Sequence, residues 1–183
     1  MKAHGYALFE TPIGHCAVAW NDAGLAAVWL PEADEETLRA AVARRLGDAA
    51  SATPPEHVHA AMRRISAVLG GAADDLADLP LDTAGLPDFH CRVYAATRRI
   101  VPGATRTYGE IAGELGEPHS ARAVGQALGR NPFPVVVPCH RVLAANGAAG
   151  GFSAPGGVRT KLRLLEIEQA RVGGAPGLFD RMN

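Results

Sequence analysis

The first 30 residues gather their apolar positions into three short runs, and turn residues separate these runs. This pattern predicts strands at 6–11, 16–20 and 25–30, with turns at Thr11–Gly14 and Asn21–Gly24. A proline follows the third run and is expected to end it. The N-terminal part of the chain is therefore predicted to form a small antiparallel sheet.

Beyond this sheet the apolar positions recur at helical spacing. The spacing predicts one helix from an Asp34 N-cap to Gly47, and another from Pro55 to Gly70. Their apolar stripes are Leu38, Val42 and Leu46 in the first helix, and Val58, Met62, Ile65 and Leu69 in the second. A last short strand is expected at 79–82.

The second half of the chain has a mostly helical pattern. Asp88 is expected to cap a helix that ends near Ile100, and Thr107 and Glu110 have the spacing of a capping box. Ser120 is expected to cap a further helix over 121–129. This helix and the one that the capping box opens form a helix-turn-helix. Its second helix presents polar side chains outward, namely Arg122, Gln126 and Arg130.

The punctuation Gly85-Leu86-Pro87 is the predicted domain boundary. We expect an α/β N-terminal domain over 1–84, made of a small antiparallel sheet plus helices. A mostly helical domain of helix-turn-helix type is expected over 85–171. Residues 172–183 are expected to form a tail.

Composition favours a cytoplasmic protein. No apolar run is long enough to span a membrane, and the first residues lack the apolar core of a secretion signal. The three cysteines, Cys16, Cys91 and Cys139, are widely spaced and odd in number. This spacing indicates neither a disulfide framework nor a zinc site.

Charge is distributed unevenly along the chain. Residues 1–88 carry 6 Lys and Arg against 13 Asp and Glu, whereas residues 89–171 carry 11 against 5. A basic half of this kind is typical of a domain that binds a polyanion such as nucleic acid. The overall net charge of −1 hides this asymmetry.

The segment VVVPCHRV, residues 135–142, carries the candidate chemistry. Three prolines flank the valine run, which we expect to be a restrained, buried strand. Cys139 follows it, beside a histidine and an arginine, and nearby positive charge favours the nucleophilic thiolate. In an extended segment adjacent side chains diverge, so contact between Cys139 and His140 would need a turn or a water. The alternative is an inert core thiol with a satisfied histidine.

Five motifs in order resemble one protein family. SARAVGQALGRNPFPVVVPCHRV, starting at Ser120, closely resembles the signature of the O6-alkylguanine-DNA alkyltransferases, also called methylated-DNA–protein-cysteine methyltransferases. The similarity extends upstream to Val101-Pro102-Gly103 and Thr107–Ala112, and downstream to Gly151-Phe152-Ser153 and to KLRLLEIE at 161–168. It covers residues 79–170, about half of the chain.

The resemblance implies a direct-reversal DNA repair protein. Such a methylated-DNA–[protein]-cysteine S-methyltransferase moves an alkyl group from O6-alkylguanine, and from O4-alkylthymine, to its own cysteine, once and without a cofactor. Its partner is double-stranded DNA, entered from the minor groove with the damaged base flipped out, and membranes are not involved. The resemblance also implies a monomer, a ribonuclease H-like N-terminal domain and a winged helix-turn-helix-type domain that binds DNA and holds the active site.

The resemblance also assigns roles to residues. Cys139 would accept the alkyl group, and His140 would deprotonate the Cys139 thiol through a water. A glutamate would orient the histidine, and Glu168 is preferred over Glu166 because it falls on the helix face shared with Lys161. The resemblance further implies that Asn131 is a hinge, that Tyr108 lies beside the lesion and that Arg122 enters the duplex as a finger. Other DNA contacts are expected from Ser120, Ala121, Gln126 and Arg130. The alkyl pocket is expected to be formed by Pro134, Val142, Phe152 and Ser153.

Three departures from the family pattern stand out. Ala154-Pro155 resembles an insertion in the loop that follows Ser153. Tyr94 stands where relatives often have tryptophan, which we expect to change packing only. Some relatives hold a structural zinc with two N-terminal cysteines, but Cys16 has no such partner here, so no metal is expected.

Three other functions compete with repair. A non-catalytic damage sensor would use the same fold without a nucleophile, but Cys139 is present. A helix-turn-helix regulator would use the cysteine as a switch, but no second DNA-binding module is evident. A cysteine hydrolase would need an oxyanion hole, for which no motif is evident.

Overall fold

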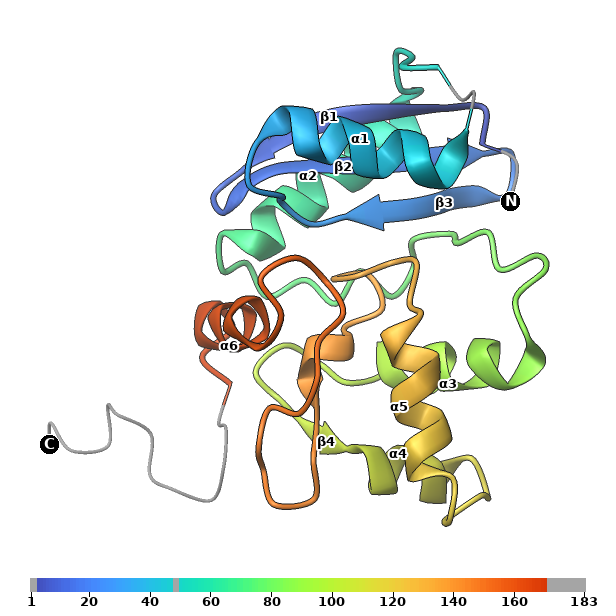
Figure 1. The fold of residues 1–183 in the computed structure, drawn as a ribbon, viewed down its shortest axis with the longest axis vertical. Coiled ribbons are helices and arrows are strands. Elements are labelled where there is room, and N and C mark those ends of the chain that lie inside the picture. Colours follow the sequence, from blue (N-terminus) through green and yellow to red (C-terminus); the bar gives the residue numbers. More distant parts are fainter. Residues whose placement is uncertain (1–2, 48–49, 171–183) are drawn as a thin grey trace, which may run out of the picture.

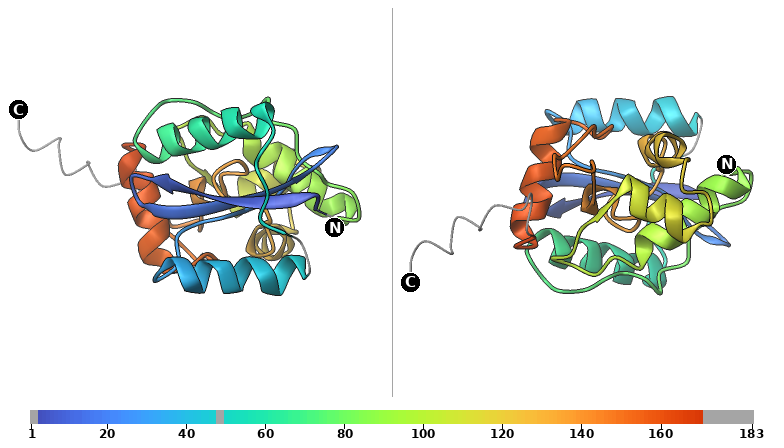
Figure 2. Two further views of the ribbon diagram at one scale, coloured as in Figure 1. Left: turned by 90° about the horizontal axis from the view of Figure 1, so that it is seen from above. Right: turned by 90° about the horizontal axis from the view of Figure 1, so that it is seen from below.

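The computed structural model describes residues 3–47 and 50–170, so the predicted tail at 172–183 lies outside the described part. A three-stranded sheet lies at one end, with α1 and α2 on its opposite faces, and the helices of the second half pack below it (Figures 1 and 2). Within the described residues no helix is both long and apolar enough to cross a membrane.

The predicted N-terminal meander is confirmed. Strands β1 (Gly5–Thr11), β2 (Gly14–Asn21) and β3 (Gly24–Trp29) pair antiparallel in sequence order. The turn glycine Gly24 has a φ of 132°, and a Cβ there would lie 2.3 Å from the carbonyl oxygen of Pro80. A glycine is therefore needed where the later chain crosses the end of this hairpin.

Both N-terminal helices form where the apolar spacing predicts them. In α1 (Glu35–Leu46) the Asp34 side chain accepts a hydrogen bond from the Thr37 amide at 2.8 Å, as an N-cap does. All four predicted stripe residues of α2 (Glu56–Leu69) are buried. The predicted strand at 79–82 is wrong: it forms one bridge, between Leu25 and Leu81, because the chain pairs there for only a single residue.

The second half is mostly helical, as predicted. It comprises α3 (Asp88–Arg98), β4 (Arg106–Thr107), α4 (Tyr108–Glu114), α5 (Ala121–Gly129), a 3₁₀ turn at Cys139–Arg141, β5 (Val142–Leu143) and α6 (Val158–Ile167). β4 and β5 pair in parallel and bring distant segments together. The small antiparallel sheet plus helices, followed by a helical part, agrees with the predicted fold class at this level.

Of the helix caps predicted in the second half, one forms as expected and two do not. The capping box is confirmed, with the Thr107 hydroxyl and the Glu110 carboxylate each accepting from the other's backbone amide. Asp88 is not a cap, because Pro87 occupies that position without a capping hydrogen bond. Ser120 occupies the N-cap position of α5, but its hydroxyl bonds to Glu117 instead of an α5 amide.

The two halves share one core. A single cluster of buried apolar residues extends from Ala7 in β1 to Leu164 in α6. The Val28 amide donates to the Pro132 carbonyl at 2.9 Å, and Arg98 donates to carbonyls of the 76–79 segment. The helical half is therefore held directly against the sheet and the loops around it.

Tyr94 does more than pack, contrary to the expectation from sequence. It is 2% exposed, and its hydroxyl donates to the Ala127 carbonyl at 2.9 Å. This hydrogen bond joins α3 to α5, the second helix of the helix-turn-helix. Tyr94 therefore helps to set the position of α5.

We expect Tyr94→Phe to lower the free energy of unfolding by about 1 kcal/mol, the usual net value of one buried hydrogen bond. Urea unfolding followed by circular dichroism measures this loss. Phe89→Leu, at a partly buried position of the same helix that gives up no hydrogen bond, is the matched control. A Tyr94→Phe protein as stable as the wild type would show that the hydroxyl does not contribute.

Candidate active site

The segment before Cys139 is a strained turn and not the strand expected from its valines. The Val137 amide donates to the Phe133 carbonyl at 2.7 Å, and Val135 has a φ of 74°. A β-branched residue rarely adopts this left-handed conformation, which costs about 1–3 kcal/mol. The prolines and the buried position keep the turn in place, because Val135, Val136 and Val137 are all at most 2% exposed.

Asn131 ties this turn together. Its side-chain oxygen accepts from the Phe133 amide, while its Nδ2 donates to the Val137 carbonyl at 2.9 Å and reaches the Cys139 Sγ at 3.3 Å. Asn131 directly follows α5 and its C-cap. The position of the thiol is therefore coupled to the end of that helix.

Cys139 begins the 3₁₀ turn and is 7% exposed. Burial raises the pKa of its thiol, and the Asn131 hydrogen bond and the Lys161 charge oppose this effect. The resting sulfur is therefore a protonated thiol at neutral pH. A base is needed to make it nucleophilic.

His140 and Glu168 form a buried pair behind the thiol. The His140 Nε2 lies 2.9 Å from the Glu168 Oε1, and the two side chains are 1% and 5% exposed. Burial would raise the pKa of Glu168, but hydrogen bonds from His140 and Arg141 lower it to about 2. Glu166 is exposed, so the geometry selects Glu168 as the histidine's partner.

The ionised carboxylate decides which ring nitrogen of His140 carries the proton. A carboxylate only accepts hydrogen bonds, so the Nε2 donates and the Nδ1 keeps its lone pair. Burial lowers the pKa of His140, although the Glu168 hydrogen bond opposes this effect. The lowered pKa keeps the ring neutral. The Nδ1 is buried and has no hydrogen-bond partner among the described residues. The Nδ1 of His140 is therefore free to accept a proton.

Arg141 is buried and holds the glutamate from the other side. Its Nε and Nη2 donate to the Glu168 carboxylate, and its Nη1 donates to the Ile100 carbonyl at 2.5 Å. Two roles are conceivable for this arginine from sequence, joining the two halves or raising the local potential. Its hydrogen bonds within the described residues all lie in the second half, so it does not join the halves.

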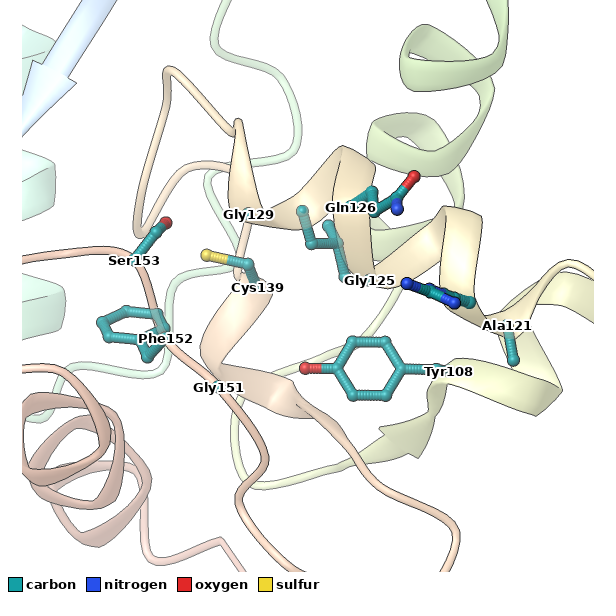
Figure 3. A pocket seen from close by; sticks show the side chains of 11 residues that line it. Tyr108, Ala121, Gly125, Gln126, Gly129, Cys139, Gly151, Phe152 and Ser153 are labelled. Carbon is teal, nitrogen blue, oxygen red and sulfur yellow. The ribbon is translucent and has the colours of Figure 1, made fainter.

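A cavity of about 570 Å³ opens in front of Cys139, and we call it the α5 cavity because that helix forms one wall. Seven predicted site residues line it: Tyr108, Ala121, Arg122, Gln126, Cys139, Phe152 and Ser153. In Figure 3 the rings of Tyr108 and Phe152 lie on either side of Cys139, whose sulfur points toward the Phe152 and Ser153 side.

The glycines around Tyr108 make room for its ring. A Cβ on Gly150, where φ is 65°, would lie 3.3 Å from the Tyr108 hydroxyl, and one on Gly125 would touch the ring at 3.8 Å. Burial raises the pKa of Tyr108, so its hydroxyl stays protonated and can donate a hydrogen bond. The ring closes the α5 cavity on the side of α4.

A second cavity also borders Cys139, and we call it the α1 cavity because Ala41, Arg44 and Arg45 of that helix line it. Its volume is about 260 Å³, and Pro134, Asn131 and Arg130 line it together with residues of the N-terminal half. Cys139, Phe152 and Ser153 line both cavities. Ala154 and Pro155 also line the α1 cavity.

The comparisons with known proteins agree with this geometry. Residues 88–170 match the family model described as 6-O-methylguanine DNA methyltransferase, DNA binding domain. The methylated-DNA–protein-cysteine methyltransferase of Mycolicibacterium paratuberculosis is 34% identical over 175 residues, which cover 96% of this chain and 98% of the relative. The chain belongs to this family.

Solved structures of methyltransferases of this family have the same fold. OGT from Mycobacterium tuberculosis in complex with DNA has a TM-score of 0.71 and 33% identity, over 93% of this chain and 96% of that one. The O6-methylguanine-DNA methyltransferase of Pyrococcus kodakaraensis has a TM-score of 0.69 and 29% identity, over 90% and 98% of the two chains. The family resemblance of the sequence is thereby confirmed.

Besides His140 and Glu168, two predicted site residues of this methyltransferase line neither cavity. Val142 is fully buried and presents its carbonyl to Lys161, so it supports the site from behind. Ser120 is half-buried before α5 and lines neither cavity. Both positions follow from backbone geometry that a linear motif does not specify.

Lys161 is the site residue that the sequence reasoning missed. It is fully buried, donates to the Val142 carbonyl at 2.5 Å, and lies 5.7 Å from the Tyr108 ring centroid. Burial lowers the pKa of this ammonium to about 8, and its charge lowers the pKa of the Cys139 thiol. The available signal was its position on the helix face shared with Leu165 and Glu168.

We expect Glu168→Gln to lower the free energy of unfolding by about 3–5 kcal/mol at neutral pH, because it leaves Arg141 buried and unpaired. The pKa of Glu168 is about 2 in the folded protein, against an ordinary value near 4.5. The carboxylate therefore stabilises the fold fully above about pH 4.5, and this stabilisation is lost as the pH falls toward 2.

Urea unfolding of the wild type and of Glu168→Gln from about pH 7 to about pH 3 tests this expectation. The difference between the two proteins should shrink as the pH falls below about 4.5. Glu166→Gln, on the exposed face of α6, is the control and should change little. A difference that stays constant with pH would contradict the ion-pair assignment.

Proposed function

We propose that this protein repairs DNA by moving a methyl or larger alkyl group from O6-alkylguanine to Cys139, irreversibly and once per molecule. O4-alkylthymine is proposed as a second substrate. The observation that carries the proposal is the position of Cys139. Its thiol borders the α5 cavity, and the buried His140–Glu168 pair follows directly behind it.

In the proposed reaction the Sγ proton passes through a water to the free Nδ1 of His140. The Glu168 carboxylate stabilises the imidazolium that forms, as an orienting acid does in other nucleophile–histidine systems. Asn131 and the Lys161 charge favour the thiolate while it lasts. These residues oppose part of the effect of burial, which still leaves the pKa of the thiol raised.

The thiolate then attacks the alkyl carbon from the side opposite O6. The S–C bond forms as the C–O6 bond breaks, and the electron pair of the broken bond stays with the guanine. The base takes up a proton donated by the Tyr108 hydroxyl. The proton held on His140 then replaces the one that Tyr108 gave up. The product is an S-alkylcysteine, and no step of the proposed reaction restores the free Cys139 thiol.

The α5 cavity supports a flipped-base mechanism. A base inside a duplex cannot reach a buried thiol, so it must leave the stack at a cost of about a few kcal/mol. Arg122 is exposed at the start of α5 and lines this cavity. A guanidinium there can fill the space that the base vacates, while Ser120, Ala121, Gln126 and Arg130 contact the backbone from the minor-groove side.

The finer features of the fold belong to the same proposal. We infer a ribonuclease H-like N-terminal domain over 1–84 and a winged helix-turn-helix-type domain over 85–171, supported by the order of α4 and α5. We also infer a monomeric, cytoplasmic protein. The three cysteines are free thiols in the described structure, which fits a reducing compartment.

The decisive test is the intact mass of the protein after it is mixed with a duplex that contains one O6-methylguanine. We expect the mass to rise by one methyl group per molecule, mapped to Cys139 by peptide analysis. Cys139→Ser is the control and should gain nothing. Tight binding without a mass change would overturn the transfer and favour a damage sensor instead.

We expect Arg122→Ala to slow methyl transfer from duplex DNA by about tenfold to a hundredfold, equivalent to about 1.4–2.8 kcal/mol of lost stabilisation of the extruded state. Rapid-quench kinetics on the same lesion in single-stranded DNA should show a much smaller loss, since no base pair is opened there. Arg163→Ala, exposed on α6, is the control. Equal losses on both substrates would contradict the finger role.

A further inference from the structure

The α1 cavity gives more room beside Cys139 than a methyl group fills. A methyl carbon carries only hydrogens beside the line that joins the sulfur, the carbon and O6. A longer substituent must leave that line sideways, so it needs room next to the sulfur. The α1 cavity provides about 260 Å³ there, against about 30 Å³ for one water molecule.

The walls of the α1 cavity suit an alkyl chain near the thiol. Pro134, Phe152 and Pro155 contribute apolar surface beside Cys139, and Leu30 adds more from the segment after β3. Gly129, Cys139, Phe152 and Ser153 line both cavities, so the two cavities adjoin at the thiol. A substituent could thus extend from a base in the α5 cavity, past the sulfur, into the α1 cavity.

The lining of the α1 cavity carries a net positive charge. Arg44 and Arg45 from α1 and Arg130 after α5 line it, against one acidic residue, Glu32. The Arg45 guanidinium lies 5.9 Å from the centroid of the Trp29 ring, a contact that holds it beside the cavity.

These three arginines differ from most others in the protein. Arg39, Arg63, Arg64, Arg92, Arg99, Arg106 and Arg141 all form ion pairs. Among the described residues, Arg44, Arg45 and Arg130 form none with any acidic side chain. The charges of Arg44 and Arg45 are therefore available to a ligand in the α1 cavity.

We propose that the α1 cavity receives O6 substituents that end in a carboxylate, and that Arg44 and Arg45 make the protein prefer them to neutral substituents of the same size. The inference rests on the proposed function and specifies its substrates. The thiolate forms its bond to the first carbon of the substituent, and the C–O6 electron pair leaves with the guanine. The carboxylate keeps its charge and ends on the thioether of Cys139, beside the arginines.

The test compares two lesions of equal size in the same duplex. One carries O6-(3-carboxypropyl)guanine, and the other carries its neutral amide, O6-(3-carbamoylpropyl)guanine. Single-turnover rates with the wild type should favour the carboxylate by about fivefold, the effect of one screened charge contact of about 1 kcal/mol. The Arg44→Gln/Arg45→Gln double variant should remove this preference while leaving the rate on O6-methylguanine unchanged.

Two further variants separate charge from structure. Arg45→Lys keeps the charge and should keep the preference for the carboxylate. Arg63→Gln removes a positive charge from α2, away from the α1 cavity, and should leave the preference intact. Thermal unfolding of each variant checks that the fold is retained.

The experiment distinguishes failure of the carboxylate preference from failure of methyl transfer itself. A rate ratio that is the same in the wild type and in the double variant would overturn the inference while methyl transfer continued. Weaker binding of all duplexes by the double variant, undamaged DNA included, with an unchanged ratio would mean that the arginines contact DNA phosphates, and would also overturn it. Absence of methyl transfer in the wild type would instead defeat the proposed function.

Discussion

The buried carboxylate of Glu168 is the interaction on which the site depends. It accepts from His140 on one side and from Arg141 on the other, and Arg141 in turn holds the Ile100 carbonyl. Removing a carboxylate of this kind would leave a guanidinium unpaired in the core and an imidazole without a fixed tautomer. The same contact thus joins α6 to the 3₁₀ turn and selects the nitrogen that can accept a proton.

Much of the fold follows from local sequence signals. The three strands, the helices α1 and α2 and the Thr107–Glu110 capping box form where apolar spacing and cap residues indicate. Such signals act over a few residues, so a single sequence carries them completely. The choice of Glu168 over Glu166 was also accessible, because helical spacing alone places one on the buried face and the other in solvent.

Other features depend on distant contacts and could not be read from local signals. The valines at 135–137 favour a strand, but the hydrogen bonds of Asn131 and the flanking prolines hold them in a turn with Val135 left-handed. The segment at 79–82 meets β3 for one residue only. Helical spacing places Lys161 on the face of Leu165 and Glu168, but its hydrogen bond to the Val142 carbonyl of β5 is a contact with a distant segment.

The raised pKa of Cys139 has a consequence for the life of the protein between synthesis and use. A protein that reacts once loses its value if oxidants or small electrophiles consume its thiol first. Oxidation proceeds through the thiolate, and a buried sulfur that stays protonated supplies little of it. The low exposure that makes the resting site unreactive therefore preserves it, so each stored molecule remains intact until a damaged base reaches it.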